Sequence, residues 1–245
     1  MHAAGVSILM YHQVGAFAPM RTHRAVYCHH RRFAAQMAYL HRLRYPVLRL
    51  DEALAGLRGE RPLPARSVVL TFDDGYENFY EYALPVLARY GFPAMVYVLA
   101  DRLGQPAAWL GVDGRATPPL MTAARLRELR RAGIDIGSHG LTHRRLALVE
   151  RAVAEREVAH SKQRLEQLLG EPVAHFCYPY GSYDDAVVDM VAAAGYRSAV
   201  TCDRASAFAG ADVLRLPRKA ISYGDSLLGV AWKLHMKRHP RRRAV

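Results

Sequence analysis

The stretch SVVLTFDDGY, residues 67–76, joins an apolar strand pattern to a polar end. Its first six residues form a short, mostly apolar run that predicts a buried β-strand. Asp73 and Asp74 follow directly, and Gly75 permits a tight turn after them. Adjacent side chains on an extended chain point in different directions, so one carboxylate can bind a metal ion while its neighbour handles a proton. Because Asp-Gly is also a common turn pair, this stretch alone does not separate a catalytic pair from an ordinary turn.

Similar apolar runs recur along the chain and alternate with helical patterns. We predict further strands at residues 6–11, 94–99, 134–137, 174–178 and 196–201. Helices are expected at about residues 31–42, between 75 and 91, between 122 and 133, at 150–169 and at 183–194. This alternation is typical of parallel βαβ units, so the fold class is α/β. A closed or partly open (β/α) barrel fits best, and a doubly wound open sheet is the alternative.

Length and composition favour one enzyme-sized domain. The chain has 245 residues, enough for a single large core, and no apolar run reaches the roughly 20 residues that a membrane span needs. Cys28, Cys177 and Cys202 are too far apart in sequence for a CxxC zinc motif and are odd in number. The first residues lack the pattern of a secretory signal, so we expect a protein of the cytoplasm or of the inner membrane surface.

The formal charge of +12 has one obvious cluster, at the end of the chain. We therefore expect residues 1–225 to form the domain and residues 226–245 to form a basic, solvated tail. A weaker alternative is peripheral membrane contact, in which Trp232 and Leu234 lie against lipid beside the basic side chains.

A second polar cluster is SHGLTH, residues 138–143, which follows the predicted strand IDIG. His139 and His143 are four residues apart, so on a helical turn they share one face. Two imidazoles at that spacing can bind one cation, although a chance pair is plausible in a chain with 12 histidines.

Two more clusters follow predicted strands. In FCYPYG, residues 176–181, Pro179 and Gly181 shape a loop that can aim backbone N–H groups inward, and Tyr180 can line a sugar site. An aromatic turn without function is an equally good interpretation of that loop. His12, in MYHQV, also follows a strand and is either a rim residue or a partly buried structural histidine.

Taken together, these four clusters indicate one site. In parallel α/β folds the carboxyl ends of the strands meet at one rim, where active sites form. One carboxylate with two imidazoles suits a divalent metal ion, most readily zinc, while cobalt or iron would also fit. Such an ion polarises a carbonyl and lowers the pKa of water toward about 7. A spare carboxylate can take the proton of that water, which completes the apparatus for amide hydrolysis.

The order TFDDG, SHxxTH and Pro-Tyr-Gly resembles the polysaccharide deacetylases of the NodB-homology type, carbohydrate esterase family 4. The resemblance covers roughly residues 6–222 and is nearest to the exopolysaccharide and poly-N-acetylglucosamine deacetylases. It implies a distorted (β/α) barrel that removes N-acetyl groups from N-acetylhexosamine units of a glycan or glycan precursor. It also implies that Asp73 is the catalytic base, that Asp74, His139 and His143 bind the metal, and that the backbone N–H of Tyr180 stabilises the oxyanion.

Two features depart from the family pattern. Many members have an arginine two residues before the motif proline, where this chain has Cys177; Arg218, in RLPRKAIS, is our candidate for supplying that charge. The family's late Leu-x-His, which provides the general acid, has no clear counterpart, because His235 lies in the basic end. His12 is therefore the candidate general acid, on the strength of its predicted place at the rim.

The departures keep other functions open. A small-amide hydrolase of the same fold and a glycan-binding pseudoenzyme are the alternatives to the N-deacetylase. Binding of nucleic acid is suggested by the charge alone, and no recognised motif accompanies it, so nucleic acid is not an expected partner. The irregular segments 13–31 and 103–119 are expected to border the substrate groove.

Overall fold

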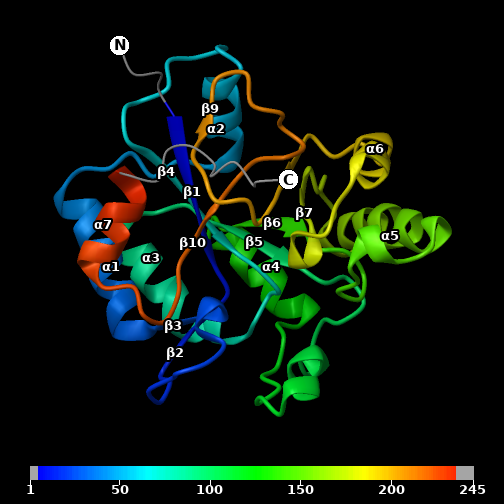
Figure 1. Cartoon of the computed structure of the whole chain (residues 1–245), viewed down its shortest axis with the longest axis horizontal. Helices are drawn as coiled ribbons and strands as arrows, with labels where there is room; N and C mark the ends of the chain where they lie inside the picture. The colour runs from blue at the N-terminus through cyan, green and yellow to red at the C-terminus, as the bar shows by residue number, and fades with distance from the viewer. Residues whose placement is uncertain (1–4, 236–245) are drawn as a thin grey trace, which may run out of the picture.

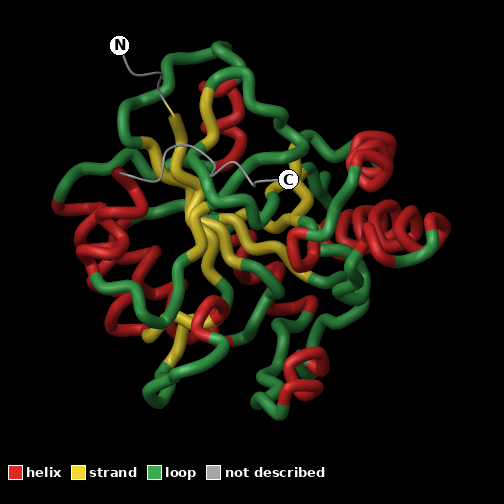
Figure 2. Tube along the Cα trace, viewed as in Figure 1, coloured by secondary structure: helices red, strands yellow, loops and turns green. Residues whose placement is uncertain are grey.

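The apolar runs form one curled sheet at the centre of the molecule (Figures 1 and 2). The computed structural model describes residues 5–235, with the side chain of Asp113 left out. The sheet consists of β1 (Gly5–Tyr11), β4 (Ser67–Phe72), β5 (Met95–Val98), β6 (Asp135–Ser138), β7 (His175–Cys177), β8 (Ser198–Val200) and β10 (Lys219–Ala220), with β9 (Ala207–Phe208) antiparallel to β1. A separate pair is formed by β2 (Gln13–Gly15) and β3 (Tyr27–His29).

The strand order defines a barrel that is closed by an irregular segment. The parallel strands follow one another as β10-β1-β4-β5-β6-β7-β8, without the reversal that marks a doubly wound sheet. Between β8 and β10, Leu216 bridges in parallel to Val200, and its N–H donates to the carbonyl of Ala199 at 2.9 Å. The same segment continues into β10 beside β1. The expected distorted (β/α) barrel is therefore confirmed, and the open-sheet alternative is wrong.

Helices cover the outside of the sheet, so strands such as β4 are buried along their whole length. They are α1 (His30–Arg42), α2 (Leu50–Leu57), α3 (Leu84–Tyr90), α4 (Ala123–Arg131), α5 (Arg151–Leu169), α6 (Asp185–Ala193) and α7 (Leu227–His235). Shorter turns of helix are η1 (Arg24–Val26), η2 (Phe79–Ala83, a π-helix), η3 (Ala108–Asp113), η4 (Leu146–Leu148) and η5 (Pro179–Gly181). None of the described helices is long and apolar enough to span a membrane.

Alternate residues of each strand face two different apolar clusters. The outer cluster joins Leu70 and Phe72 of β4 to the covering helices. The inner cluster joins Val69 of β4 and Ile8 of β1 to Leu54 of α2 and to other inward-facing side chains. The inward parity of β4 continues from Val69 into Thr71 and Asp73, so it delivers a carboxylate to the interior of the barrel at its carboxyl end.

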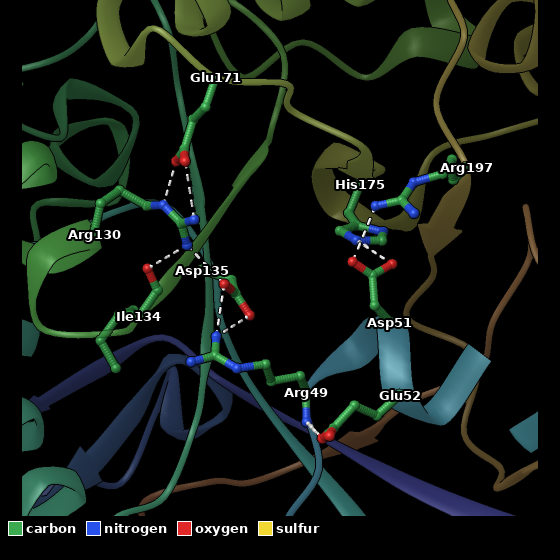
Figure 3. Close-up of polar contacts among 9 residues, drawn as sticks. All are labelled: Arg49, Asp51, Glu52, Arg130, Ile134, Asp135, Glu171, His175 and Arg197. Carbon is green, nitrogen blue, oxygen red and sulfur yellow. Dashed lines mark hydrogen bonds and ion pairs between the residues drawn. The ribbon is translucent and has the colours of Figure 1, made fainter. Parts of the chain in front are cut away.

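The opposite end of the barrel is held by charged pairs (Figure 3). Both carboxylate oxygens of Asp135, at the start of β6, lie 2.8 Å from the guanidinium of Arg49, which precedes α2. His175, at the start of β7, lies with its Nε2 3.2 Å from Oδ1 of Asp51. These contacts fix α2 across the amino ends of the strands, which in barrels is the end away from the active site.

The predicted basic tail is only partly a tail. Residues 227–235 form α7, which packs on α1 and buries Val230 and Leu234, so the expectation of a solvated end is wrong for this part. The reason is the four-residue spacing of those two apolar side chains, which places them on one helix face. Leu234 is consequently not available to lipid, while Trp232 is about half exposed. Residues 236–245 lie outside the described part of the chain.

Candidate active site at the carboxyl ends of the strands

The two carboxylates after β4 sit in an unusual backbone turn. The N–H of Asp73 donates to the carbonyl of Tyr11 at 3.0 Å, which extends the β1–β4 pairing by one residue. Asp74 then takes a φ of 74°, a left-handed conformation that is uncommon for a residue other than glycine. Gly75 also has a positive φ, and a Cβ there would come within 2.9 Å of a methyl group of Val98. The turn therefore sends the two carboxylates to different places, and strain of this kind concentrates at functional sites.

Asp73 is held by a fully buried arginine. The Nη1 and Nη2 atoms of Arg218 each donate to a different oxygen of Asp73 at 2.7 Å. The other N–H groups of Arg218 donate to the carbonyl of Thr201 at 2.9 Å, to Oγ1 of Thr71 at 3.0 Å and to Sγ of Cys177 at 3.2 Å. All five donors of the guanidinium are thus used. Arg218, which precedes β10, stands against the carboxylate and beside the residue where the family pattern has its own arginine.

This pair keeps Asp73 ionised. Burial alone would raise the pKa of Asp73, but the charge and hydrogen bonds of Arg218 outweigh it and lower the pKa below its usual value. His12, which follows β1, lies with its Nε2 3.9 Å from Oδ2 of Asp73. A charged carboxylate and an imidazole therefore face each other at the rim.

Asp74 faces the two predicted histidines. Its Oδ1 lies 3.2 Å from Nε2 of His139 and 3.3 Å from Nε2 of His143. All three side chains are almost completely buried. Burial lowers the pKa of His143 to about 4, so this imidazole is neutral near pH 7 and has a lone pair to offer.

The second nitrogen of His139 orients its ring. Its Nδ1 lies 2.8 Å from the carbonyl oxygen of Cys177, so this nitrogen carries the proton and donates. The lone pair of Nε2 then points toward Asp74, the arrangement that metal-binding histidines usually have.

The loop that carries His143 is held from below by Glu157 of α5. This buried carboxylate accepts from the N–H of Leu141 at 2.8 Å, from the N–H of Thr142 at 2.9 Å and from the hydroxyl of Thr142. His143 itself has a φ of 68°. A left-handed histidine needs such support, because its conformation is not the one that the backbone prefers.

The donor set fits a divalent cation. Oδ1 of Asp74 is buried and, within residues 5–235, accepts no hydrogen bond, although two imidazole nitrogens converge on it. One carboxylate oxygen and two imidazoles are the ligands of many catalytic zinc sites. A second possible set is Asp73, His139 and Cys177. We favour the first set, because Arg218 occupies both oxygens of Asp73 and burial raises the pKa of the Cys177 thiol, which leaves it protonated.

These groups open into a small cleft of about 100 Å³. Two aromatic rings flank His143, with centroid distances of 4.5 Å to Trp109 and 4.2 Å to Tyr180. The guanidinium of Arg145 lies 4.2 Å above the ring of Tyr180. A larger cavity, about 640 Å³, lies behind the loop against α5, and the three candidate ligands are outside its lining. The chemistry therefore belongs to the smaller cleft.

The structure brings most of the predicted site residues together. His12, Asp73, Asp74, His139, His143 and Tyr180 line the cleft, and Arg218 lies directly beneath Asp73. Pro179 is buried next to the histidine loop rather than in the cleft wall. Val26, Trp109, Leu110 and Arg115 line the cleft from the two irregular segments that were expected to border it.

Some residues of the site had no signal in the sequence. Tyr76, Tyr178 and Cys202 also line the cleft, and Glu157 lies under the loop. Only Tyr76 and Tyr178 stand inside motifs that were singled out. Glu157 is one of several charged residues in a helical pattern, and nothing but its contacts distinguishes it.

Comparison with known proteins gives the same family as the motifs. Residues 60–199, more than half of the chain, match the model of the family described as polysaccharide deacetylase. YxkH of Bacillus subtilis (strain 168) is 27% identical over 223 residues, which are 91% of this chain and 74% of that protein. The poly-beta-1,6-N-acetyl-D-glucosamine N-deacetylase of Staphylococcus epidermidis is 26% identical over 170 residues, which span 65% of this chain and 56% of that enzyme.

A solved structure has the same fold over nearly the whole length. The Streptococcus pyogenes deacetylase PplD, in complex with acetate, superposes with a TM-score of 0.82 at 25% identity and covers 96% of this chain and 100% of its own. The chain belongs to the polysaccharide deacetylase family, and it is accordingly a hydrolase.

Proposed function

We propose that this protein hydrolyses the acetamido group of N-acetylhexosamine units in a glycan or glycan precursor, releasing acetate and a free amine. The observation that carries the proposal is the convergence of Asp74, His139 and His143 next to a separate, ionised Asp73. One carboxylate is thereby free for proton transfer while the other belongs to a cation site. The name of the staphylococcal relative supports an N-acetylglucosamine polymer as the substrate class.

Asp74, His139 and His143 would hold the divalent cation, with zinc preferred and cobalt or iron as alternatives. When bound there, the cation supplies Lewis-acid polarisation of the amide carbonyl and acidifies water. The neutral imidazole of His143 and the donor bond from His139 to Cys177 both suit that role.

The chain's own residues would carry the proton transfers. Asp73 accepts a proton from the attacking water, because it is ionised and stands beside the ligand set. The backbone N–H of Tyr180, in the loop with a φ of 58°, stabilises the developing oxyanion. His12 donates a proton to the departing amine; its position in the cleft supports this role. Trp109 and Tyr180 offer apolar faces to the sugar ring.

The test is acetate release from N-acetylglucosamine oligomers by the zinc- or cobalt-loaded protein. Asp73→Asn should bind the metal ion with unchanged stoichiometry and lose about 10²–10⁴-fold in kcat, the usual contribution of a general base. His139→Ala should lose the metal ion itself, as measured by calorimetry. His160→Ala removes an exposed histidine outside the cleft and serves as the matched control.

The outcomes separate the alternative functions. Faster hydrolysis of small amides than of any sugar would replace the glycan substrate by a small-amide substrate. Tight binding of glycan without release of acetate, despite one metal ion per chain, would make the protein a glycan-binding pseudoenzyme.

A further inference from the structure

The net charge of the chain is confined to its two terminal segments. Residues 1–50 contain seven arginines and no Lys, Asp or Glu, and residues 226–245 contain six Lys or Arg and no Asp or Glu. The 175 residues between them carry 21 Lys or Arg and 22 Asp or Glu, so they are almost neutral. The charge of +12 therefore does not reflect a general use of arginine; it marks two stretches of sequence.

The fold brings these two stretches together. Helix α7 packs against α1 at one side of the molecule, away from α5 and α6 (Figure 1). The guanidinium of Arg32 donates to the carbonyl of Tyr223 at 2.5 Å, and the N–H of Tyr223 donates to the carbonyl of Arg24 at 2.8 Å. At the other end of α7, His235 Nε2 lies 2.7 Å from the hydroxyl of Tyr45. We call the surface made by α1, α7 and the turn at residues 223–224 the α1–α7 face.

The α1–α7 face is also the most apolar part of the described surface. Seven large apolar side chains are at least 41% exposed in residues 5–235, and four belong to the two basic stretches: Leu43 (42%), Leu227 (42%), Leu228 (83%) and Trp232 (51%). Leu228 and Trp232 are four residues apart and so share one face of α7. Val230 and Leu234 already bury the other apolar stripe against the domain. An outward apolar stripe on so short a helix marks an interaction surface rather than a core.

We propose that the α1–α7 face binds peripherally to the surface of an anionic lipid bilayer. A helix that presents Leu and Trp beside a basic surface is suited to the boundary between headgroups and acyl chains. Tryptophan favours that boundary because its ring is apolar and its N–H is polar. Lys237, Arg238 and Arg241–Arg243 follow α7 in the sequence and add positive charge within a few residues of the stripe. Nucleic acid would also attract the charge, but it offers no counterpart for an aliphatic side chain as exposed as Leu228.

The experiment uses the full chain with vesicles of phosphatidylcholine, alone or with 30% phosphatidylserine. The chain has two tryptophans, so a Trp109→Phe background leaves Trp232 as the only indole reporter. We expect sedimentation with the anionic vesicles only, together with a blue shift of the Trp232 emission. Leu228→Ser should weaken binding roughly tenfold, from the lost burial of one leucine. Replacing Arg241, Arg242 and Arg243 by Ser should weaken it by up to about 100-fold, since each cation near an anionic leaflet contributes about fivefold.

A matched control distinguishes insertion from general stickiness. Leu148→Ser removes a side chain that is 76% exposed, in η4, far along the chain from both basic stretches, and should leave vesicle binding unchanged. Binding that depends on the arginines but not on Leu228, with no shift of the Trp232 emission, would overturn the proposal. Tighter binding to duplex DNA than to anionic vesicles at the same salt concentration would also overturn it, in favour of a nucleic-acid partner.

Discussion

Replacing Arg218 by Lys tests whether the buried guanidinium sets the state of Asp73. Lysine keeps the positive charge but brings three donors in place of five, and it cannot form two parallel bonds to one carboxylate. Two hydrogen bonds are therefore lost, at about 0.5–1.5 kcal/mol each. We expect Arg218→Lys to lower the free energy of unfolding by about 1–3 kcal/mol. Arg218→Met would leave Asp73 buried without an opposing charge and should cost about 3–5 kcal/mol, which a marginally stable domain barely survives.

The pH dependence gives a second, independent measure. Arg218 lowers the pKa of Asp73, so the carboxylate stays ionised, and able to act as a base, down to acidic pH. Weakening the pair raises that pKa toward its usual value or above it, because burial then acts with less opposition. The acidic limb of the kcat/KM profile should consequently move to higher pH in Arg218→Lys. Stability follows the same sign: the contribution of the pair is present above the unfolded pKa and is lost as the pH falls through the folded one.

The assays are urea unfolding at pH 7 and acetate release between pH 4 and pH 8. Arg197→Lys is the matched control, because it alters an exposed arginine that also contacts an aspartate, Asp51, and should cost less than about 1 kcal/mol. An unfolding free energy within 0.5 kcal/mol of the parent, or an acidic limb that does not move in Arg218→Lys, would refute this account of the pair.

Two further predictions concern other parts of the fold. Glu157→Gln exchanges a carboxylate for an amide under the histidine loop, so it should weaken zinc binding about tenfold or more, as losses of outer-shell support do, and alter the visible spectrum of the cobalt form; an unchanged metal affinity and spectrum would mean that the loop holds His143 without it. Asp51 has a lowered pKa because His175 donates to it, so Asp51→Asn should destabilise the protein by about 1 kcal/mol at pH 7 and by less near pH 3, where the parent carboxylate is protonated too; an equal difference at both pH values in urea unfolding would contradict this.

Local patterns predicted most of the barrel correctly, because its strands are short apolar runs with a polar residue at each end. The strand at residues 67–72 has the predicted limits, and the helix predicted at residues 150–169 begins one residue later. Helix α2 was not predicted, since its eight residues give too little periodicity to stand out. The basic composition hid α7, where two buried side chains, Val230 and Leu234, decide the structure.

The same contrast holds in the site. The candidate metal ligands come from short motifs, where two or three residues at fixed spacing carry the chemistry. Glu157 was missed, because its function in the loop depends on backbone N–H groups of residues 141 and 142, and these leave no mark on the sequence.

Arg218 shows why a missing motif residue is weak evidence for a lost activity. Cys177 and Arg218 are 41 residues apart, yet the Sγ atom lies 3.2 Å from Nη2 because both residues face the interior of the same barrel. In a closed barrel every strand end looks into one small space, so a cation can reach Asp73 from any strand at the right level. A small residue on β7 leaves room for a long one that enters beside β10, and the carboxylate receives the same two hydrogen bonds from either side. Interpretation of the family's arginine as a position in the sequence predicts a pseudoenzyme; interpretation as a charge at a place in the barrel predicts a working base, which is the prediction that the geometry of Asp73 favours.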